Sequence, residues 1–276
     1  MRGKMLRVAR IAGLAVTVLG LATLAAFAQQ AAQKDSWPEL AASIFNGRPL
    51  ADGAGLIAIE MPGRAEDAAI VPVTIRSTLP PGDMRRVKAF TIVIDENPAP
   101  VAAVFHIGPN AVVPSISTRV RIDSYTNVHA VAELNDGNLY VVKTYVKASG
   151  GCSAPSVKSA DKAGVGQMRF RQFAKGTDAA TGNLRDAQIM IRHPNNSGLQ
   201  MDQITRLYTP AYFVQSVKIW QGEDLLLTVE SSISISEDPN FRFSYLPSGA
   251  KSFVAEAVDT DNRIFKADWP ADASQM

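Results

Sequence analysis

Cysteine, histidine and aromatic residues are scarce in this sequence. A single cysteine among 276 residues excludes an intramolecular disulfide framework, and it excludes metal sites built from four cysteines or from two cysteines and two histidines. Three histidines leave little for a histidine-rich metal centre. We therefore expect neither a metal ion nor another cofactor.

Neither sign of charge is in large excess. The chain has 28 basic and 26 acidic residues, a formal charge of +2, and four of the basic residues lie in the first ten positions. Without those four, 24 basic residues face 26 acidic ones, and the net charge becomes −2. A protein that binds nucleic acid normally needs a basic surface. We therefore expect no nucleic-acid partner.

One uncharged apolar run, residues 11–27, stands out near the N-terminus. It follows a basic segment and ends in Ala26-Phe27-Ala28, a pattern typical of a secretory signal peptide. We predict that residues 1–28 are removed, that the mature protein is periplasmic, and that it makes no further membrane contact. An uncleaved anchor is the alternative, since about seventeen apolar residues nearly span a bilayer, but the Ala-x-Ala site favours cleavage.

One short helix and many strands are expected after the signal peptide. Ser36-Trp37-Pro38-Glu39 has the spacing of a capping box, which predicts a helix over 37–45. Beyond it, period-two alternation and β-branched runs favour strands. The expected strands are 56–60, 70–77, 87–95, 101–107, 115–122, 127–134, 139–147, 185–192, 211–221, 224–232, 241–246, 252–259 and 263–268.

The expected strands form two groups separated by a stretch with few large apolar residues. About seven short strands with tight turns are typical of an immunoglobulin-like sandwich, so residues 36–147 and 184–270 are each expected to form one. Residues 148–183 are polar and small, which favours a flexible linker. The predicted fold class is all-β, with two immunoglobulin-like β-sandwiches in tandem and one short N-terminal helix.

The lone cysteine lies in that linker, and its neighbours are unusual. Gly150 and Gly151 precede Cys152, and Ser153 follows it, so no apolar neighbour in the sequence provides a core position. Five residues beyond the preceding strand extend roughly 15 Å. We predict that Gly150, Gly151 and Ser153 form a flexible arm that holds Cys152 in solvent. Nearby lysines would favour the thiolate, and an exposed thiol on an arm suits the covalent attachment of a carried group.

Other roles for Cys152 stay open. A cysteine hydrolase needs a base within hydrogen-bonding reach, but His106, His129 and His193 are all distant from Cys152 in the sequence. A buried structural cysteine and a disulfide-linked dimer through Cys152 are further alternatives. The loop from His193 to Gly198 is more typical of a turn than of a ligand site, and Asp95-Glu96 and Glu237-Asp238 are expected to be solvated.

Short motifs on both sides of the linker resemble a known family. The motifs of the first block are Val71-Pro72-Val73-Thr74-Ile75, residues 88–98, Val104-Phe105-His106, Ser117-Thr118-Arg119-Val120-Arg121, residues 131–137 and Gly150-Gly151-Cys152; those of the second are Ile191-Arg192-His193-Pro194, Gly198, Pro210-Ala211-Tyr212-Phe213-Val214 and Asn240-Phe241-Arg242-Phe243. The first block resembles SoxY, the sulfur carrier of bacterial thiosulfate oxidation, and the second resembles its partner SoxZ. Together they resemble the fused SoxYZ-like carriers associated with quinoprotein (PQQ) dehydrogenases.

The resemblance implies a non-catalytic carrier whose cysteine holds substrate-derived sulfur between enzymes. The hypothesis is therefore a periplasmic protein that holds a sulfur-containing group on Cys152 and presents it to sulfur-oxidation enzymes. The alternative is a binding or assembly partner of a quinoprotein dehydrogenase and its cytochrome c. One departure is clear: SoxY ends in a free Gly-Gly-Cys-Gly-Gly arm, whereas here Ser153-Ala154-Pro155 leads into another domain, so the loop is tethered at both ends.

Overall fold

The computed structural model describes residues 35–80, 82–155, 164–173 and 183–271. The chain divides into two units, Met1–Ser36 and Trp37–Met276, and the fold below is that of the second unit. The predicted signal peptide, 1–28, lies outside the described residues. In the described part of the chain, no helix is both long enough and apolar enough to cross a membrane.

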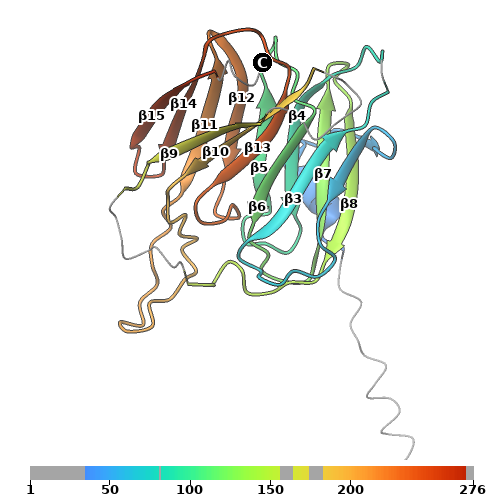
Figure 1. The fold of residues 1–276 in the computed structure, drawn as a ribbon. Helices are drawn as coiled ribbons and strands as arrows, with labels where there is room; N and C mark the ends of the chain where they lie inside the picture. Colours follow the sequence, from blue (N-terminus) through green and yellow to red (C-terminus); the bar gives the residue numbers. More distant parts are fainter. Residues whose placement is uncertain (1–34, 81, 156–163, 174–182, 272–276) are drawn as a thin grey trace, which may run out of the picture. The chain divides into compact units, whose positions relative to one another are not determined.

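One helix and fifteen strands make up the described elements (Figure 1). The helix is α2 (Trp37–Ile44). The strands of the first half are β1 (Leu50–Asp52), β2 (Ile57–Glu60), β3 (Val71–Ser77), β4 (Val87–Ile94), β5 (Val101–Ile107), β6 (Ser115–Val120), β7 (Thr126–Leu134) and β8 (Leu139–Val146). Those of the second half are β9 (Met168–Phe173), β10 (Arg185–Ile191), β11 (Val214–Gln221), β12 (Asp224–Ser231), β13 (Asn240–Tyr245), β14 (Ser252–Asp259) and β15 (Ile264–Pro270).

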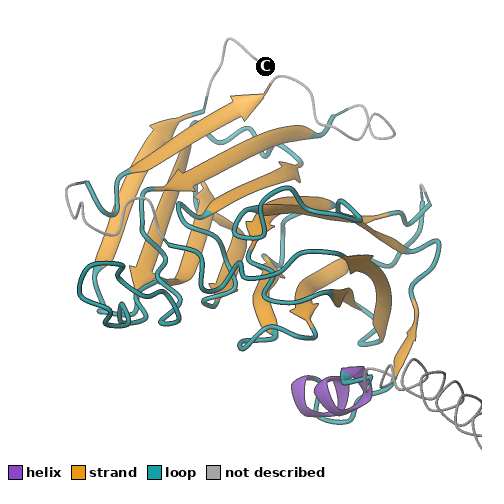
Figure 2. Cartoon of the chain, turned by 90° about the horizontal axis from the view of Figure 1, so that it is seen from below, coloured by secondary structure: helices purple, strands orange, loops and turns teal. Residues whose placement is uncertain are grey.

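The all-β fold predicted from the sequence is confirmed, and both halves contribute strands to the same two sheets. The order of the nine-stranded sheet is β1-β8-β7-β4-β5-β12-β11-β14-β15, and that of the six-stranded sheet is β2-β3-β6-β13-β10-β9. The two sheets form the layers visible in Figure 2. Antiparallel pairing of β5 with β12 and of β6 with β13 crosses from one half to the other. The two sandwiches are therefore joined edge to edge.

All thirteen strands predicted from the sequence are present, and two further strands, β1 and β9, were not predicted. β1 has only three residues, too few for a period to be recognised. β9 lies inside the predicted linker, and the prediction of a flexible connection over 148–183 is wrong for this segment. Its sequence, Met-Arg-Phe-Arg-Gln-Phe, alternates arginine with large apolar residues, and pairing with β10 satisfies its backbone.

Helix α2 covers the outer face of the nine-stranded sheet. Ala41 and Phe45 pack on Val93, Val131 and Leu139 in a small cluster that is separate from the main core. This helix was predicted from its capping box and apolar spacing, and only its last residue differs.

A buried histidine–aspartate pair lies beside the helix. His129 Nδ1 lies 2.9 Å from Asp95 Oδ1, and both side chains are almost fully buried. The ring of Trp37 stacks on His129 with centroids 3.6 Å apart. The expectation that Asp95 is solvated is therefore wrong, because it is the buried partner of a histidine on the adjacent strand β7.

One hydrophobic core extends through both halves. Phe105 on β5 and Phe241 on β13 are fully buried, and their rings meet edge to face with centroids 6.0 Å apart. Both belong to the same cluster, which runs from Ile57 in the first half to Ala257 in the second. The halves therefore share apolar burial as well as strand pairing.

We predict that the two halves unfold together and that Phe241→Ala destabilises both. Removing this ring should cost about 3–5 kcal/mol of the free energy of unfolding. Trp37 reports on the first half, and Trp220 and Trp269 report on the second. Urea unfolding followed by fluorescence in a Trp37→Phe background, and in a Trp220→Phe/Trp269→Phe background, should give equal shifts of the midpoint.

The matched control is Ile264→Ala, whose side chain is 60% exposed, and it should cost less than about 1 kcal/mol. If Phe241→Ala lowered the urea midpoint reported by Trp220 and Trp269 but not the midpoint reported by Trp37, the halves would be independent domains.

Candidate functional site

The structure buries Cys152 completely, and the prediction of a solvent-exposed thiol on a flexible arm is wrong for this conformation. Gly151 is buried beside it, whereas Gly150 and Ser153 lie at the surface. Cys152 nevertheless lies outside both hydrophobic clusters of the described residues. The thiol is therefore buried apart from these two clusters.

Four hydrogen bonds seat the cysteine loop, residues 148–155, on the rest of the protein. The Gly150 and Gly151 amides donate to the carbonyl oxygens of Asp123 and Ile122, at 2.8 and 2.9 Å. Ser197 Oγ donates to the Cys152 carbonyl oxygen at 2.5 Å. The fourth bond comes from an arginine and is described below. The loop is thus held by strand ends of the first half and by a serine of the second half.

The two glycines have structural roles that differ from the flexibility predicted for them. Gly150 adopts φ +78°, a backbone conformation that favours glycine. Gly151 passes so close to the backbone that an added Cβ would overlap the carbonyl oxygens of Ala68 and Ile122. The same residues that permit motion therefore also permit close seating of the loop.

Burial raises the pKa of the Cys152 thiol to about 12. The charge of Asp123 raises the pKa further, whereas the charge of Arg121 lowers it. At pH 7 the thiolate fraction in this conformation is on the order of 10⁻⁵. The expectation that nearby lysines activate the thiol is wrong for the closed loop, because loss of water outweighs the neighbouring positive charge.

A buried arginine lies against the cysteine loop. Arg121 is 1% exposed, and its guanidinium donates to the carbonyl oxygens of Gly151 and Asn195, each at 3.2 Å. Its Nε has no hydrogen-bond partner, and no carboxylate of the described residues lies within ion-pair distance of it. Burial lowers the pKa of Arg121, while the charges of Cys152, Glu237 and Asp67 raise it. The site therefore combines a thiol with a buried positive charge that interacts with Glu237 and Asp67 but has no carboxylate of the described residues within ion-pair distance.

The asparagine loop, residues 193–198, supports this site from the second half. Asn195 is fully buried at φ +45°, and its amide N–H donates to His193 Nδ1 at 3.1 Å. Its side-chain oxygen accepts from the Val214 amide, and its carbonyl oxygen accepts from Arg121. The sequence favoured an ordinary turn here, and the structure shows a buried turn that contacts the cysteine loop.

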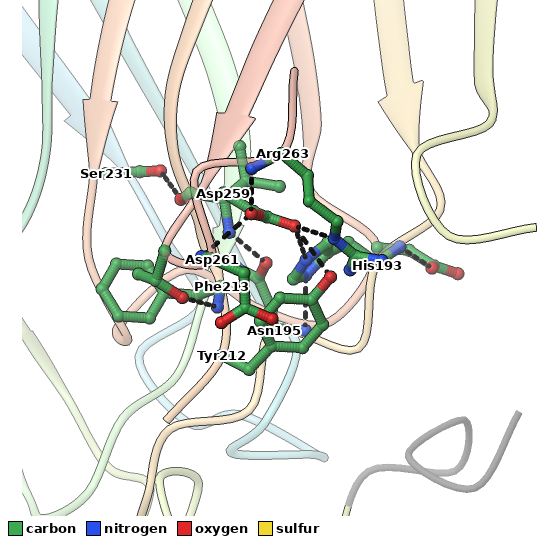
Figure 3. A network of polar contacts seen from close by, with 11 residues as sticks. His193, Asn195, Tyr212, Phe213, Ser231, Asp259, Asp261 and Arg263 are labelled. Atoms are coloured by element: carbon green, nitrogen blue, oxygen red, sulfur yellow. Dashed lines mark hydrogen bonds and ion pairs between the residues drawn. The ribbon is translucent and has the colours of Figure 1, made fainter. Parts of the chain in front are cut away.

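A polar network surrounds His193, the first residue of the asparagine loop (Figure 3). Asp259 accepts hydrogen bonds from Tyr212 at 2.8 Å and from Arg263 at 2.9 Å, and its Oδ2 lies 3.7 Å from His193 Nε2. The ring of Tyr212 lies against His193, with centroids 4.3 Å apart. The network orders the part of the second half that contacts the cysteine loop.

The three histidines lie in separate surroundings. His129 pairs with Asp95, His106 lies 3.5 Å from Glu230, and His193 lies near Asp259. Among the described residues, no hydrogen bond joins a histidine to Cys152, and no group of three histidine, cysteine or acidic side chains is arranged to hold a metal ion.

Sequence reasoning did not single out Arg121 or Ser197 as site residues. The one available signal for Arg121 was strand alternation. Ser117 and Arg119 lie two residues apart on β6, and Arg121 continues this spacing just after the strand ends. No local signal marks Ser197, whose contact with the cysteine loop comes from the second half of the chain.

We predict that His193 destabilises the fold in mild acid. Burial lowers the pKa of His193 to about 4, so the folded imidazole is neutral at pH 7, whereas the unfolded one binds a proton near pH 6.5. The unfolded state therefore gains protons first, and stability falls as the pH drops from about 6.5 toward 4. The melting temperature of His193→Gln should fall less steeply over this range than that of the unsubstituted protein.

His106→Gln is the matched control, because the His106 side chain is 48% exposed. It should leave the slope unchanged. Equal slopes for the unsubstituted protein and His193→Gln would contradict the assignment.

Comparison with known families covers both halves. Residues 41–152 match the family model of the sulfur oxidation protein SoxY, and residues 174–270 match that of the sulphur oxidation protein SoxZ. Cys152 is the last residue of the SoxY match. No curated protein sequence matches the chain.

Each of two similar solved structures matches less than half of the chain. The sulfur carrier protein SoxY from Chlorobium limicola f thiosulfatophilum is 27% identical, with 41% of this chain and 94% of that one covered and a TM-score of 0.33. A superoxide reductase (neelaredoxin) from Ignicoccus hospitalis is 14% identical, with coverage of 33% and 78% and a TM-score of 0.30. The two family models together span most of the described fold. The chain is therefore a fusion of a SoxY-family domain and a SoxZ-family domain, and it is a non-catalytic carrier protein of sulfur oxidation.

Proposed function

We propose that the protein carries a sulfur-containing group as a covalent adduct on Cys152 and presents it to sulfur-oxidation enzymes in the periplasm. The SoxY match ends at the single cysteine of the chain. The signal-peptide pattern of residues 1–28 supports the location.

The observation that carries this proposal is the buried charge of Arg121 beside Cys152. A buried cation without a close carboxylate is costly, because the loss of hydration is not offset by an opposite charge. A neutral thiol offers no compensation. A persulfide or thiosulfonate on Cys152 is an anion, and it would add a negative charge within the loop that already accepts a hydrogen bond from Arg121.

Loading with thiosulfate is a two-electron oxidation. The Cys152 thiol loses its proton, a disulfide bond forms between its sulfur and the terminal sulfur of thiosulfate, and two electrons pass to an acceptor. No bond within thiosulfate breaks. The protein supplies the sulfur nucleophile and a charged surrounding for the product, while the electron acceptor, of the cytochrome or ferricyanide class, comes from outside.

The seated loop must open for this reaction to occur. With a thiol pKa of about 12 and no exposed surface, Cys152 neither ionises appreciably nor meets a reagent in the described conformation. Opening releases the hydrogen bonds from Gly150, Gly151 and Ser197 and returns the thiol to water. Because Ala148 stays in the main core, motion is expected from Ser149 onward.

We predict that thiosulfate and ferricyanide add one group to the protein, at Cys152. Intact mass after desalting should show a single adduct that dithiothreitol removes, and Cys152→Ser should show none. An adduct of equal yield on Cys152→Ser would refute attachment at this residue. The serine variant keeps the size of the side chain, so loss of folding does not explain a negative result if its melting temperature is unchanged.

We also predict that Ser197→Ala accelerates modification of Cys152. The substitution removes the hydrogen bond to the Cys152 carbonyl and favours the open loop, so the rate of alkylation by iodoacetamide at pH 7.5 should rise about 3- to 10-fold, as expected when a hydrogen bond worth about 1 kcal/mol is lost. For every variant, the rate of alkylation should rise with pH, because the thiolate is the reactive form. The pKa of the thiol is raised in the closed loop, so deprotonation also favours the open loop.

Ser231→Ala is the matched control, since the Ser231 hydroxyl also donates to a backbone carbonyl, that of Val214, at 2.6 Å. It should leave the alkylation rate within about twofold of the unsubstituted protein. Equal rates for Ser197→Ala and the unsubstituted protein would show that the Ser197 contact does not hold the loop closed.

The burial of Cys152 also favours a second candidate function. A binding or assembly partner of a quinoprotein dehydrogenase and its cytochrome c would need no reactive thiol, and a buried Cys152 is what such a protein would contain. Complementation of a deletion strain with Cys152→Ser separates the two: the carrier loses activity, whereas the assembly partner keeps it.

A further inference from the structure

A hairpin of the second half, residues 199–208, exposes several large apolar side chains. Ile204 at its tip is 92% exposed, Leu207 and Tyr208 are 69% and 63% exposed, and Leu199 is 37% exposed. These are four of the eleven large apolar side chains that the described residues expose, and they lie within ten consecutive positions. Single exposed apolar residues are common, whereas a cluster marks a contact surface. This exposed hairpin projects at the lower left of Figure 1.

The exposed hairpin is held by its own hydrogen bonds. Met201 and Tyr208 form an antiparallel bridge at its base. At the tip, Oδ1 of Asp202 accepts hydrogen bonds from the amides of Ile204 and Thr205, at 3.0 and 2.7 Å. An apolar side chain on an ordered turn loses less conformational freedom on binding than one on a mobile segment. The hairpin is therefore already arranged to present Ile204 to a partner.

The base of the exposed hairpin is bonded to the serine that holds the cysteine loop. The Leu199 amide donates to Ser197 Oγ at 3.2 Å, and this hydroxyl donates to the Cys152 carbonyl oxygen. The Ser197 amide also donates to Oε1 of the buried Gln200, at 3.0 Å. One hydroxyl group therefore contacts both the cysteine loop and the first residue of the hairpin.

The exposed hairpin and the cysteine loop lie close enough for one partner to cover both. Ile204 is seven positions beyond Ser197 in the chain, so the two residues are at most roughly 25 Å apart. A standard protein interface buries about 800 Å² on each partner, which corresponds to a patch about 30 Å across. An enzyme that acts on Cys152 must approach the cysteine loop, and an interface of this size reaches the hairpin.

The composition of the exposed hairpin favours a protein partner with an apolar pocket. It contains one acidic and one basic residue, Asp202 and Arg206, so its net charge is zero. A segment that binds a membrane surface normally carries several lysines or arginines. A strongly charged partner would need the opposite charge on the hairpin. The hairpin instead offers a branched aliphatic side chain at its tip, followed by Leu207 and Tyr208, and tyrosine is enriched among the residues that dominate protein interfaces.

We propose that the exposed hairpin docks into an apolar pocket on the enzyme that loads or unloads Cys152. This proposal rests on the carrier function proposed above. The group on Cys152 changes at each step of such a cycle, whereas the hairpin stays the same. The hairpin therefore gives an enzyme a contact that does not depend on the carried group, and this contact lies next to the loop that must open.

The test measures how fast an enzyme extract loads the purified protein. The extract comes from the source bacterium with this gene deleted, and it is supplied with thiosulfate and with oxidised cytochrome c as the electron acceptor. Intact mass gives the initial rate of adduct formation on Cys152 over a range of protein concentrations. Ile204→Ser should raise the half-saturating concentration about tenfold, as expected when a side chain that fills a pocket is removed. It should leave the plateau rate and the melting temperature unchanged.

Met84→Ser is the matched control, because the Met84 side chain is also apolar and is 80% exposed. The Met84 carbonyl oxygen accepts a hydrogen bond from Asn135, in the turn that precedes β8. The cysteine loop follows the other end of β8, and a strand of eight residues spans roughly 25 Å. Met84→Ser should change the half-saturating concentration by less than about twofold.

The outcomes separate docking from carrying. Equal half-saturating concentrations for Ile204→Ser and the unsubstituted protein would overturn the docking proposal and leave the carrier function intact. If neither the extract nor ferricyanide with thiosulfate loaded Cys152, the carrier function would fail, and the docking proposal with it. The ferricyanide reaction needs no enzyme, so it should load Ile204→Ser as fast as the unsubstituted protein. Slower loading there would mean that the substitution acts on the thiol, and it would overturn docking.

Two further measurements exclude other occupants of the exposed hairpin. Size-exclusion chromatography that gave a dimer for the unsubstituted protein and a monomer for Ile204→Ser would assign the hairpin to a second copy of this chain. Cosedimentation with vesicles of phosphatidylethanolamine and phosphatidylglycerol, lost in Ile204→Ser, would assign it to a lipid surface. Either result would overturn docking to an enzyme.

Discussion

Strand pairing between the two halves is the constraint on which the rest of the structure depends. β5 pairs with β12 and β6 with β13, so both sheets run without interruption from the SoxY-like part to the SoxZ-like part. This pairing fixes the asparagine loop of the second half against the end of β6. Without it, Ser197 would not meet the cysteine loop and Asn195 would not meet Arg121, so the loop would be held by contacts within the first half alone.

The buried side chain of Arg121 adds an electrostatic contribution to the stability of the closed cysteine loop. A seated loop with a neutral thiol satisfies the backbone through hydrogen bonds, yet it leaves the charge of Arg121 buried with no carboxylate of the described residues within ion-pair distance. The hydrogen bonds favour closure, while the cost of burying this charge opposes it. An anion attached to Cys152 would remove the opposing contribution. The closed loop is therefore expected to be more stable around a loaded cysteine than around an empty one, which would shield the carried group between encounters with enzymes.

Much of the fold could be predicted from the sequence, and the surroundings of the cysteine could not. Thirteen strands and the helix follow from local periods and turn residues, which are properties of neighbouring positions. The position of Cys152 depends instead on contacts with Ile122 and Ser197, which lie 30 and 45 residues away in the sequence. Two glycines beside a cysteine predicted an exposed arm because glycine permits motion. In the structure, Gly151 is needed because only a residue without a Cβ fits against the Ala68 carbonyl.

Because the cysteine loop is fixed at both ends, a few hydrogen bonds can hold it closed and it can still open. A free C-terminal arm loses much conformational entropy when it docks, whereas a loop with fixed ends has less freedom to lose. A few hydrogen bonds are then sufficient to hold the loop closed, and breaking them is sufficient to open it. The same tether limits how far the thiol can travel, since residue 147 lies at the end of a strand in one sheet and β9 begins the other half at Met168. A partner enzyme must therefore approach the junction itself.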